Sequence, residues 1–484
     1  MILGIDQGTT GSRAFIFDEK GKVVTSSYSE FEQFFPKPGW VEHDAAEIWE
    51  VTKKVCHQAL DDAGLDGSKL KAIGITNQRE TAVAWDRDSG EPLHKAIVWQ
   101  DRRTAGRCDR LKAEGYEAMF RERTGLVLDA YFTGTKYEWM IKEGGVPKDA
   151  AFGTIDSWLL FKLTGRHATD YSNASRTLLF NIRELAWDAE LCDTLGVPID
   201  SLPEPVRNAE VLGETTEFGG KVPVAAMVGD QQGALYGQAC LEPGLSKNTY
   251  GTGNFLLANA GDGPPVLEQG LITTIAWGIG DRVDYAMESS MFVTGAGVQW
   301  LRDGLKIIDA ASDTEAMAAS LDSNDGVYFV PALTGLGSPH WDPYARGTIV
   351  GLTRGSSREH IARAALEAIA YQSVDAVRAQ NTALGVRLKE LRVDGGATVN
   401  GWLMQFQADM LGVPVVVPEI ADTTVLGAAY LAGVATELWT EDEVKSLWTE
   451  SKRYEPTMND DQRQSLLSDW RRALQRAGRW VIPD

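Results

Sequence analysis

The chain opens with two short apolar segments separated by a cluster of small polar residues. Residues 3–18 read LGIDQGTTGSRAFIFD, so the first apolar run stops at Asp6 and a second occupies residues 14–17. A further segment, residues 22–28, follows the turn sequence DEKG. Apolar runs of roughly four to eight residues bounded by glycine and polar residues are typical of strands. We therefore predict a three-stranded meander whose first turn is rich in Gly and Thr.

The same succession of strand, glycine-rich turn and strand recurs in the second half of the chain. Residues 245–261 contain a polar strand, a Gly-Thr-Gly turn at 251–253 and an apolar strand that begins at Phe255. Later a strand ends at Asp394, two glycines follow, and residues 402–410 carry apolar side chains at helical spacing. We interpret these segments as a second copy of one supersecondary unit.

Two more apolar runs end on polar residues. Residues 70–80, LKAIGITNQRE, read as a buried strand, and residues 222–228 form another that stops before Gly229 and Asp230. Small residues after Asp230 then favour a helix. Strands that alternate with helical segments indicate α/β layers.

Composition narrows the class of protein. The 484 residues exceed the usual size of one hydrophobic core, and 43% of them are apolar. The net charge of −21 argues against a general affinity for nucleic acid or anionic lipid. The four cysteines show no CxxC spacing, and no stretch approaches the ~20 apolar residues of a membrane span. We expect a soluble cytoplasmic protein with reduced thiols.

The glycine-rich turns have a structural interpretation and a functional one. Glycine permits tight turns in any fold, so each turn alone is weak evidence. Together they suggest phosphate binding, because such turns expose backbone N–H groups and helix N-termini attract anions. The sequence lacks the P-loop motif, the dinucleotide fingerprint and the protein-kinase motifs. What remains is a two-lobed clamp around one triphosphate.

Four motifs carry a family resemblance. GIDQGTTGSR, GDQQGALYGQ, NTYGTGNF and VDGGATVNGWLMQFQAD resemble the signatures of the FGGY carbohydrate kinases, which share the duplicated ATPase fold of actin, hexokinase and heat-shock chaperones. PKPGWVEHD, GITNQRET, AIVWQDRR and TDYSNASRTLLFNI are similar to the glycerol kinases within that family. The resemblance implies an α/β fold of two ribonuclease-H-like domains with an interdomain cleft. Residues 1–240 would form the first domain, and residues 241–484 the second, with a charged helical tail.

The resemblance also implies an activity and an acceptor site. It points to ATP-dependent phosphorylation of glycerol to sn-glycerol 3-phosphate, with Mg²⁺ as cofactor and a homodimer or homotetramer as the assembly. Asp230 would be the general base, although a helix N-cap is the alternative role for an acid at this position. Donors, acceptors and aromatic faces for a small triol would come from Arg79, Glu80, Trp99, Tyr131, Asp230, Gln231 and Phe255.

The remaining implied residues concern the nucleotide and the metal. Asp6 and Asp230 would face the magnesium ion, with Thr10 as a hydroxyl donor and Arg13 as the neutralising cation. The nucleotide site would comprise Thr9, Thr10, Gly11, Arg13, Thr252, Gly253, Gly295, Gln299, Gly396 and Asn400. We assign His43 a structural role in a surface turn. Two alternatives stay open: a kinase for another polyol or a ketose, and a nucleotide-driven conformational ATPase that phosphorylates no acceptor.

Overall fold

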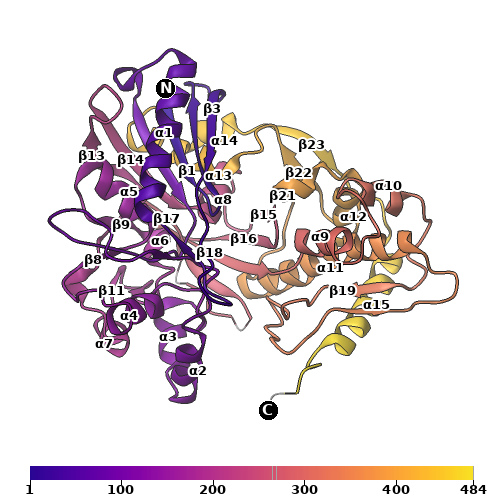
Figure 1. The fold of residues 1–484 in the computed structure, drawn as a ribbon. Coiled ribbons are helices and arrows are strands. Elements are labelled where there is room, and N and C mark those ends of the chain that lie inside the picture. Colours follow the sequence, from indigo (N-terminus) through magenta and orange to yellow (C-terminus); the bar gives the residue numbers. More distant parts are fainter. Residues whose placement is uncertain (264, 269, 483–484) are drawn as a thin grey trace.

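One mixed sheet of thirteen strands passes through both halves of the chain (Figure 1). The structure, a computed structural model, describes residues 1–263, 265–268 and 270–482. Neighbouring strands of the N-terminal half are, in spatial order, β3 (Val23–Glu30), β2 (Gly11–Phe17), β1 (Ile2–Gln7), β5 (Ala72–Asn77) and β14 (Val222–Gly229). The first three form the predicted antiparallel meander, and β5 and β14 run parallel to β1.

The C-terminal half repeats this arrangement. Its strands follow the order β18 (Arg282–Met291), β16 (Asn254–Gly261), β15 (Ser246–Tyr250), β21 (Leu391–Asp394) and β22 (Val415–Pro418). The first three are again antiparallel neighbours, and β21 and β22 are parallel to β15. The two predicted copies of one unit are therefore confirmed. Between them β13 (Ala209–Thr215) meets β17 (Ile272–Ile279).

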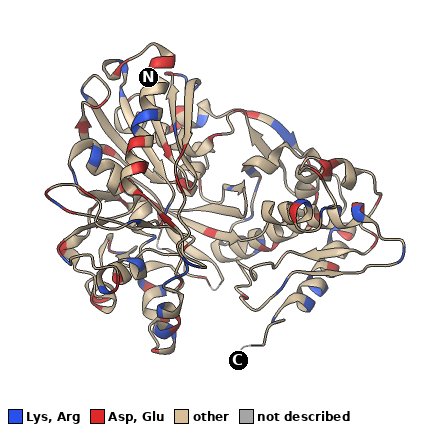
Figure 2. Ribbon diagram, viewed as in Figure 1, with Lys and Arg blue, Asp and Glu red and all other residues tan. Residues whose placement is uncertain are grey.

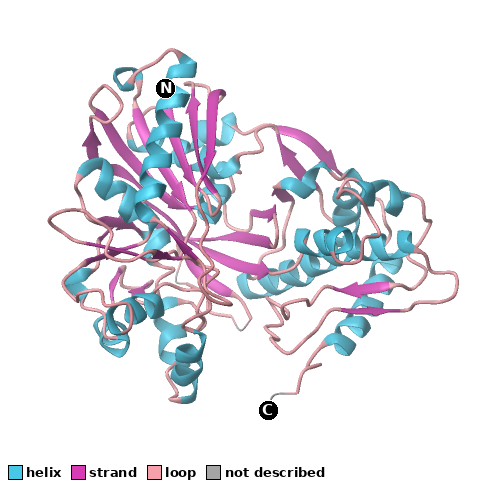
Figure 3. Cartoon of the chain, viewed as in Figure 1, coloured by secondary structure: helices cyan, strands magenta, loops and turns pink. Residues whose placement is uncertain are grey.

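Helices cover the strands of the N-terminal half on both faces (Figure 3). On one face α1 (Ala45–Ala63) packs against β2 and β3 through Ile48, Val55 and other apolar residues at helical spacing. Asp44 caps its N-terminus by accepting hydrogen bonds from two backbone N–H groups. On the other face α13 (Thr423–Ala435) lies against β1, β5 and β14. A helix from the C-terminal half of the chain thus completes the N-terminal core.

Helix α13 crosses α8 (Asp230–Gly237) with their backbones in contact. A Cβ atom on Gly427 would lie 1.9 Å from the carbonyl oxygen of Gly233, and one on Gly237 would lie 2.0 Å from that of Thr423. No side chain fits at either position, so glycine is required there. The crossing fixes α8, which begins at Asp230.

Most charged residues lie on helices and loops, and several lie on strands, for example on β23 (Glu450–Tyr454; Figure 2). Among the charged strand residues, Lys247 on β15 and Glu288 on β18 are fully buried. The predicted charged tail forms α15 (Asp460–Ala477), which inserts Leu467 and Trp470 into the C-terminal core. Within the described residues no helix is both long and apolar enough to cross a membrane, and the four cysteines are free and buried.

Candidate active site

Three parallel strands of the N-terminal sheet end in register at one edge. Gln7 of β1 and Gly229 of β14 both pair with Asn77, the last residue of β5. In open α/β sheets, ligands bind outside the carboxyl ends of the strands. The segments that follow these ends are the first glycine-rich turn, the residues after Asn77, and Asp230, so they gather at one place.

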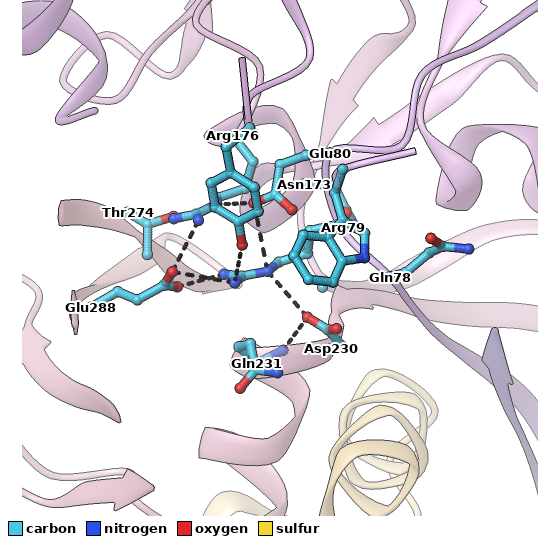
Figure 4. A network of polar contacts seen from close by, with 12 residues as sticks. Gln78, Arg79, Glu80, Asn173, Arg176, Asp230, Gln231, Thr274 and Glu288 are labelled. Carbon is cyan, nitrogen blue, oxygen red and sulfur yellow. Dashed lines mark hydrogen bonds and ion pairs between the residues drawn. The ribbon is translucent and has the colours of Figure 1, made fainter. Parts of the chain in front are cut away.

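Arg79 lies at the centre of this edge (Figure 4). Its Nη1 donates to Oε2 of Glu288 at 2.6 Å, and its Nη2 donates to the hydroxyl group of Tyr131 at 3.4 Å. Its Nε forms an ion pair with Oδ1 of Asp230 at 3.1 Å and lies 3.8 Å from Oε1 of Glu80. The guanidinium group therefore joins the candidate base to the other polar residues of the site.

Two aromatic side chains continue this set of contacts toward the first turn. The rings of Trp99 and Tyr131 meet edge to face, with their centroids 5.7 Å apart. The indole Nε1 of Trp99 donates to the hydroxyl oxygen of Thr9 at 3.0 Å. Trp99 thus connects Tyr131 to the turn that contains Thr9.

On the other side of Asp230 a buried lysine links Gln231 to Phe255. Lys247 donates from its Nζ to Oε1 of Gln231, and also to the backbone oxygen of Phe255 at 3.2 Å. Because an ammonium group only donates, the Gln231 oxygen must face Lys247 and its NH₂ group remains a donor for another partner. Burial lowers the pKa of Lys247 to about 8, against the charges of Asp394 and Asp230.

The structure thus brings all seven predicted glycerol residues into one continuous set of contacts. The set runs through Trp99, Tyr131, Arg79, Glu80, Asp230, Gln231 and Phe255. Asp230 is the first residue of α8, and the N-cap position belongs to Gly229. The N-cap alternative for Asp230 is therefore wrong.

The carboxylates of the site differ in their electrostatic surroundings. Burial raises the pKa of Asp230 despite the nearby charges of Arg79 and Lys247. Burial also disfavours the ionised form of Glu288, but Arg176 and Arg79 outweigh it and lower the pKa of Glu288 to about 2. Glu288 is therefore ionised at neutral pH, while Asp230 binds a proton more readily than an ordinary aspartate.

The first glycine-rich turn is held from behind by side-chain amides. The backbone oxygen of Gly8 accepts from Gln7 and Gln78 at 2.8 Å and 3.2 Å, and that of Thr9 accepts from Gln33 at 3.0 Å. In a trans peptide the N–H group points opposite to the C=O group. The N–H groups of Thr9 and Thr10 are therefore directed away from these amides, as an anion-binding turn requires.

Residues around this turn include the predicted metal and phosphate residues. Asp6 is the residue before the end of β1, and burial raises its pKa to about 7 against the charge of Arg13, with Asp230 and Asp422 adding to the rise. Arg13 forms an ion pair with Asp422 at 3.1 Å. Gly11 cannot carry a side chain, since a Cβ atom would lie 2.6 Å from the Ser29 oxygen.

His43 differs from its predicted setting. It lies fully buried on the two-residue strand β4 (Glu42–His43), not in a surface turn. Its Nε2 is 2.8 Å from Oε1 of Gln33, which in turn holds Thr9. Burial lowers the pKa of His43 to about 4, so it supports the turn as a neutral group.

The other predicted nucleotide residues gather around the second glycine-rich turn. Gly295, which begins α9 (Gly295–Asp303), donates its N–H to the oxygen of Gly251 at 3.1 Å, and a Cβ atom there would clash with the same oxygen. Gly395 packs equally closely against Tyr250 and precedes Gly396. Thr252, Gly253, Gly295 and Gly396 therefore occupy adjoining turns.

Asn400 follows Gly396 by four residues, and Gln299 follows Gly295 by four. The Asn400 side chain caps α12 (Gly401–Leu411) by accepting from the N–H of Leu403 at 2.9 Å. Gln299 is an exposed residue of α9. Among the described residues, neither has a hydrogen bond to the seven predicted glycerol residues.

Sequence analysis missed four buried charged residues that hold the site together: Arg176, Lys136, Lys247 and Glu288. Arg176 lies within the stretch TDYSNASRTLLFNI, and Lys247 directly precedes NTYGTGNF, yet neither was assigned a role. Glu288 stands in a strand with no motif around it. For Lys247 and Glu288, which lie on strands, the available signal was a charged residue inside an otherwise buried strand; Lys136 and Arg176 lie outside strands and gave no such signal.

Family models match both halves of the chain. Residues 1–237 match the N-terminal domain, and residues 246–436 the C-terminal domain, of the FGGY family of carbohydrate kinases. The chain belongs to the FGGY family. The predicted two-domain α/β fold of this family is confirmed, whereas the exact boundary between residues 240 and 241 stays a prediction.

Individual relatives of this FGGY kinase are glycerol kinases. The chain is 53% identical over 490 residues to glycerol kinase 2 of Thermotoga maritima, with 99% of each chain covered. It is 52% identical to the glycerol kinase of Geobacillus kaustophilus, with 98% of each covered. The crystal structure of Plasmodium falciparum glycerol kinase with ADP superimposes with a TM-score of 0.92 at 36% identity, covering 100% of this chain and 98% of that one. A gluconate kinase from Lactobacillus acidophilus shares the fold, with a TM-score of 0.88 at 22% identity, covering 98% of this chain and 96% of that one.

Proposed function

We propose that this chain is a glycerol kinase, which transfers the γ-phosphoryl group of ATP to glycerol and forms sn-glycerol 3-phosphate. The observation that carries the proposal is the continuous set of polar and aromatic contacts from Trp99 to Phe255 around Asp230. The full-length likeness to glycerol kinases supports the same acceptor. A triol whose hydroxyl groups each pair with a buried donor or acceptor is favoured over analogues that leave such groups unpaired.

In the proposed reaction Asp230 is the general base. It takes the proton from a terminal hydroxyl group of glycerol as that oxygen forms a bond to the γ-phosphorus. The bond between the γ-phosphorus and the oxygen that bridges it to the β-phosphate breaks, and ADP leaves. The raised pKa of Asp230 supports this role, because a base accepts a proton more readily when its conjugate acid is weaker.

The triphosphate would lie between the two glycine-rich turns. Thr9, Thr10, Gly11 and Arg13 would bind it from the first turn, where the backbone oxygens of Gly8 and Thr9 are already occupied. From the second lobe we propose Thr252, Gly253, Gly295, Gln299, Gly396 and Asn400. Catalysis of phosphoryl transfer rests mainly on positioning and on charge stabilisation, which these backbone groups and Arg13 would supply.

Asp6 and Asp230 are the residues that would face the magnesium ion. The charge of Asp230 adds to the raised pKa of Asp6, so a cation near both carboxylates would relieve their repulsion. Among the described residues no group of three potential ligands surrounds one point. This fits Mg²⁺, which usually binds through one or two carboxylates, water and the substrate phosphates. When bound, the ion would neutralise charge on the phosphate oxygens.

An acceptor panel tests the proposal. Pure protein with MgATP would be incubated with glycerol, erythritol, xylulose, ribulose and gluconate, and ADP release and ³¹P NMR of the product would be followed. We expect the highest kcat/KM for glycerol. A higher kcat/KM for a ketose or another polyol would overturn the assignment. ATP turnover that is independent of any acceptor would instead favour the conformational ATPase.

A further inference from the structure

Four buried charged residues form a closed ring behind the proposed glycerol site (Figure 4). Glu288 accepts from Arg79 at 2.6 Å and 3.3 Å, and from Nη2 of Arg176 at 3.0 Å. Nε of Arg176 donates to Oε1 of Glu80 at 2.6 Å, and Glu80 closes the ring 3.8 Å from Nε of Arg79. Each of the four side chains is at most 2% exposed.

The ring joins segments that are far apart in the sequence. Arg79 and Glu80 follow β5, and Arg176 follows the short helix α6 (Tyr171–Ala174). Glu288 comes from β18 of the C-terminal half. Among the described residues, Glu288 is the carboxylate with hydrogen bonds to both guanidinium groups. Its charge therefore separates two buried cations that would otherwise repel each other in a medium of low dielectric constant.

The ring leaves one donor and one acceptor of the pair Arg79–Glu80 without a hydrogen bond. Both terminal nitrogens of Arg79 donate to other side chains, whereas its Nε has ion-pair contacts but no hydrogen bond within the described residues. Oε1 of Glu80 accepts from Arg176, and no described donor reaches Oε2. A donor and an acceptor this close match two neighbouring hydroxyl groups, one accepting and one donating.

The backbone at Glu80 shows that this arrangement is imposed by its surroundings. Glu80 has a φ of 60°, a left-handed conformation that non-glycine residues rarely adopt. Its backbone oxygen accepts from the buried ammonium group of Lys136 at 2.8 Å. Such strained conformations persist where neighbouring groups over-determine them, and they cluster at functional sites.

We propose that Glu288 is a positioning residue that determines acceptor specificity. Because Glu288 holds Arg79 and Arg176, it sets the spacing between the donor Nε of Arg79 and the acceptor Oε2 of Glu80. This spacing selects acceptors that have two adjacent hydroxyl groups. This inference rests on the proposed function. Glu288 itself does not touch the acceptor; it acts through Arg79, and through Arg176 on Glu80.

The test compares glycerol with 1,3-propanediol, which has no adjacent hydroxyl pair, in the wild type and in Glu288→Gln. Rates are measured at high enzyme concentration by ³¹P NMR, so that slow turnover is quantified. We expect the ratio of the two kcat/KM values to fall at least tenfold in the variant, with the KM for MgATP within twofold of wild type. A merely structural role would lower activity toward both acceptors equally, and an unchanged ratio would overturn the inference.

Two further variants complete the design. Glu367→Gln is the matched control, because Glu367 is a buried acid paired with Arg363 at 2.8 Å on α11 (Arg358–Leu384); its ratio should equal that of wild type. If Glu288→Gln does not melt cooperatively, Glu288→Asp decides: it keeps the charge and should lower the ratio about threefold or more, and an unchanged ratio would again overturn the inference. Wild-type protein that does not phosphorylate glycerol would refute the proposed function instead.

Discussion

Replacing Asp230 by asparagine should remove the proposed base while it leaves the contacts around residue 230 largely in place. The amide has nearly the shape of the carboxylate, and its oxygen can keep the hydrogen bond from the Gln231 N–H, which is 2.7 Å long. The same oxygen can stay beside Nε of Arg79, which lies 3.1 Å from Oδ1 of Asp230. Arg79 also retains both bonds to Glu288. The variant therefore loses a proton acceptor and a charge, but few contacts.

The expected magnitudes follow from these contacts. General-base catalysis contributes about 10²–10⁴ to the rate, so kcat should fall by that factor. The KM for glycerol should change by less than about tenfold, because a neutral hydrogen bond contributes only about 0.5–1.5 kcal/mol. The Asp230 side chain is 31% exposed, and burial already disfavours its charge, so the free energy of unfolding should change by about 1 kcal/mol or less.

The assay is ADP release at saturating glycerol and MgATP, combined with urea denaturation of the same preparations. Asp284→Asn is a matched control, because Asp284 is a buried acid on β18 that pairs with Arg282 outside the site. The control should keep full kcat. If Asp230→Asn kept kcat within threefold of wild type while remaining folded, the assignment of the base would be refuted.

Three further predictions follow from buried groups. Lys136→Met removes the donor to the backbone oxygens of Glu80 and Tyr131. In initial-rate assays this variant should raise the KM for glycerol about tenfold or more and leave the KM for MgATP unchanged. Equal changes in the two KM values would contradict this prediction. Burial raises the pKa of Asp156 to about 7, so the native state binds more protons than the unfolded state between pH 4 and 7. In urea denaturation, the free energy of unfolding should fall by up to about 1.4 kcal/mol for each unit that the pH rises in that range. Asp156→Asn should flatten this dependence on pH. An unchanged dependence in the variant would refute Asp156 as its cause. Gly427→Ala places a Cβ atom 1.9 Å from the Gly233 oxygen and should lower the free energy of unfolding by about 1–3 kcal/mol or more. An unaltered thermal unfolding midpoint would contradict the close backbone contact between α8 and α13.

Local signals in the sequence predicted the parts of the fold that depend on neighbouring residues. The apolar runs that end at or before Asp6, Asp230 and Asp394 are strands in the structure, because short apolar runs and the glycine turns that bound them are encoded within a few residues. Short motifs that resemble those of the FGGY kinases also supplied the residues that we propose for glycerol binding. The repeat of the first hairpin at residues 245–261 was visible for the same reason.

Long-range pairing explains what the sequence did not reveal. Glu288 reaches Arg79 only because β18 pairs with β16 and β17 and carries its side chain to an edge formed more than 200 residues earlier. The deep burial of His43 likewise depends on the pairing of β4 with β7 (Ala96–Ile97). No short motif encodes contacts between residues this far apart in the sequence, so the ring of charged residues is evident only from the three-dimensional structure.

The crossing of α8 and α13 limits which amino-acid substitutions this enzyme can tolerate. Contact between Gly427 and Gly233, and between Gly237 and Thr423, is made by main-chain atoms, with no side chains interposed. Asp230 sits at the first residue of α8, so its location is set by atoms that every amino acid shares. Random mutagenesis should therefore tolerate almost nothing at residues 233, 237 and 427, although none of them is among the proposed site residues.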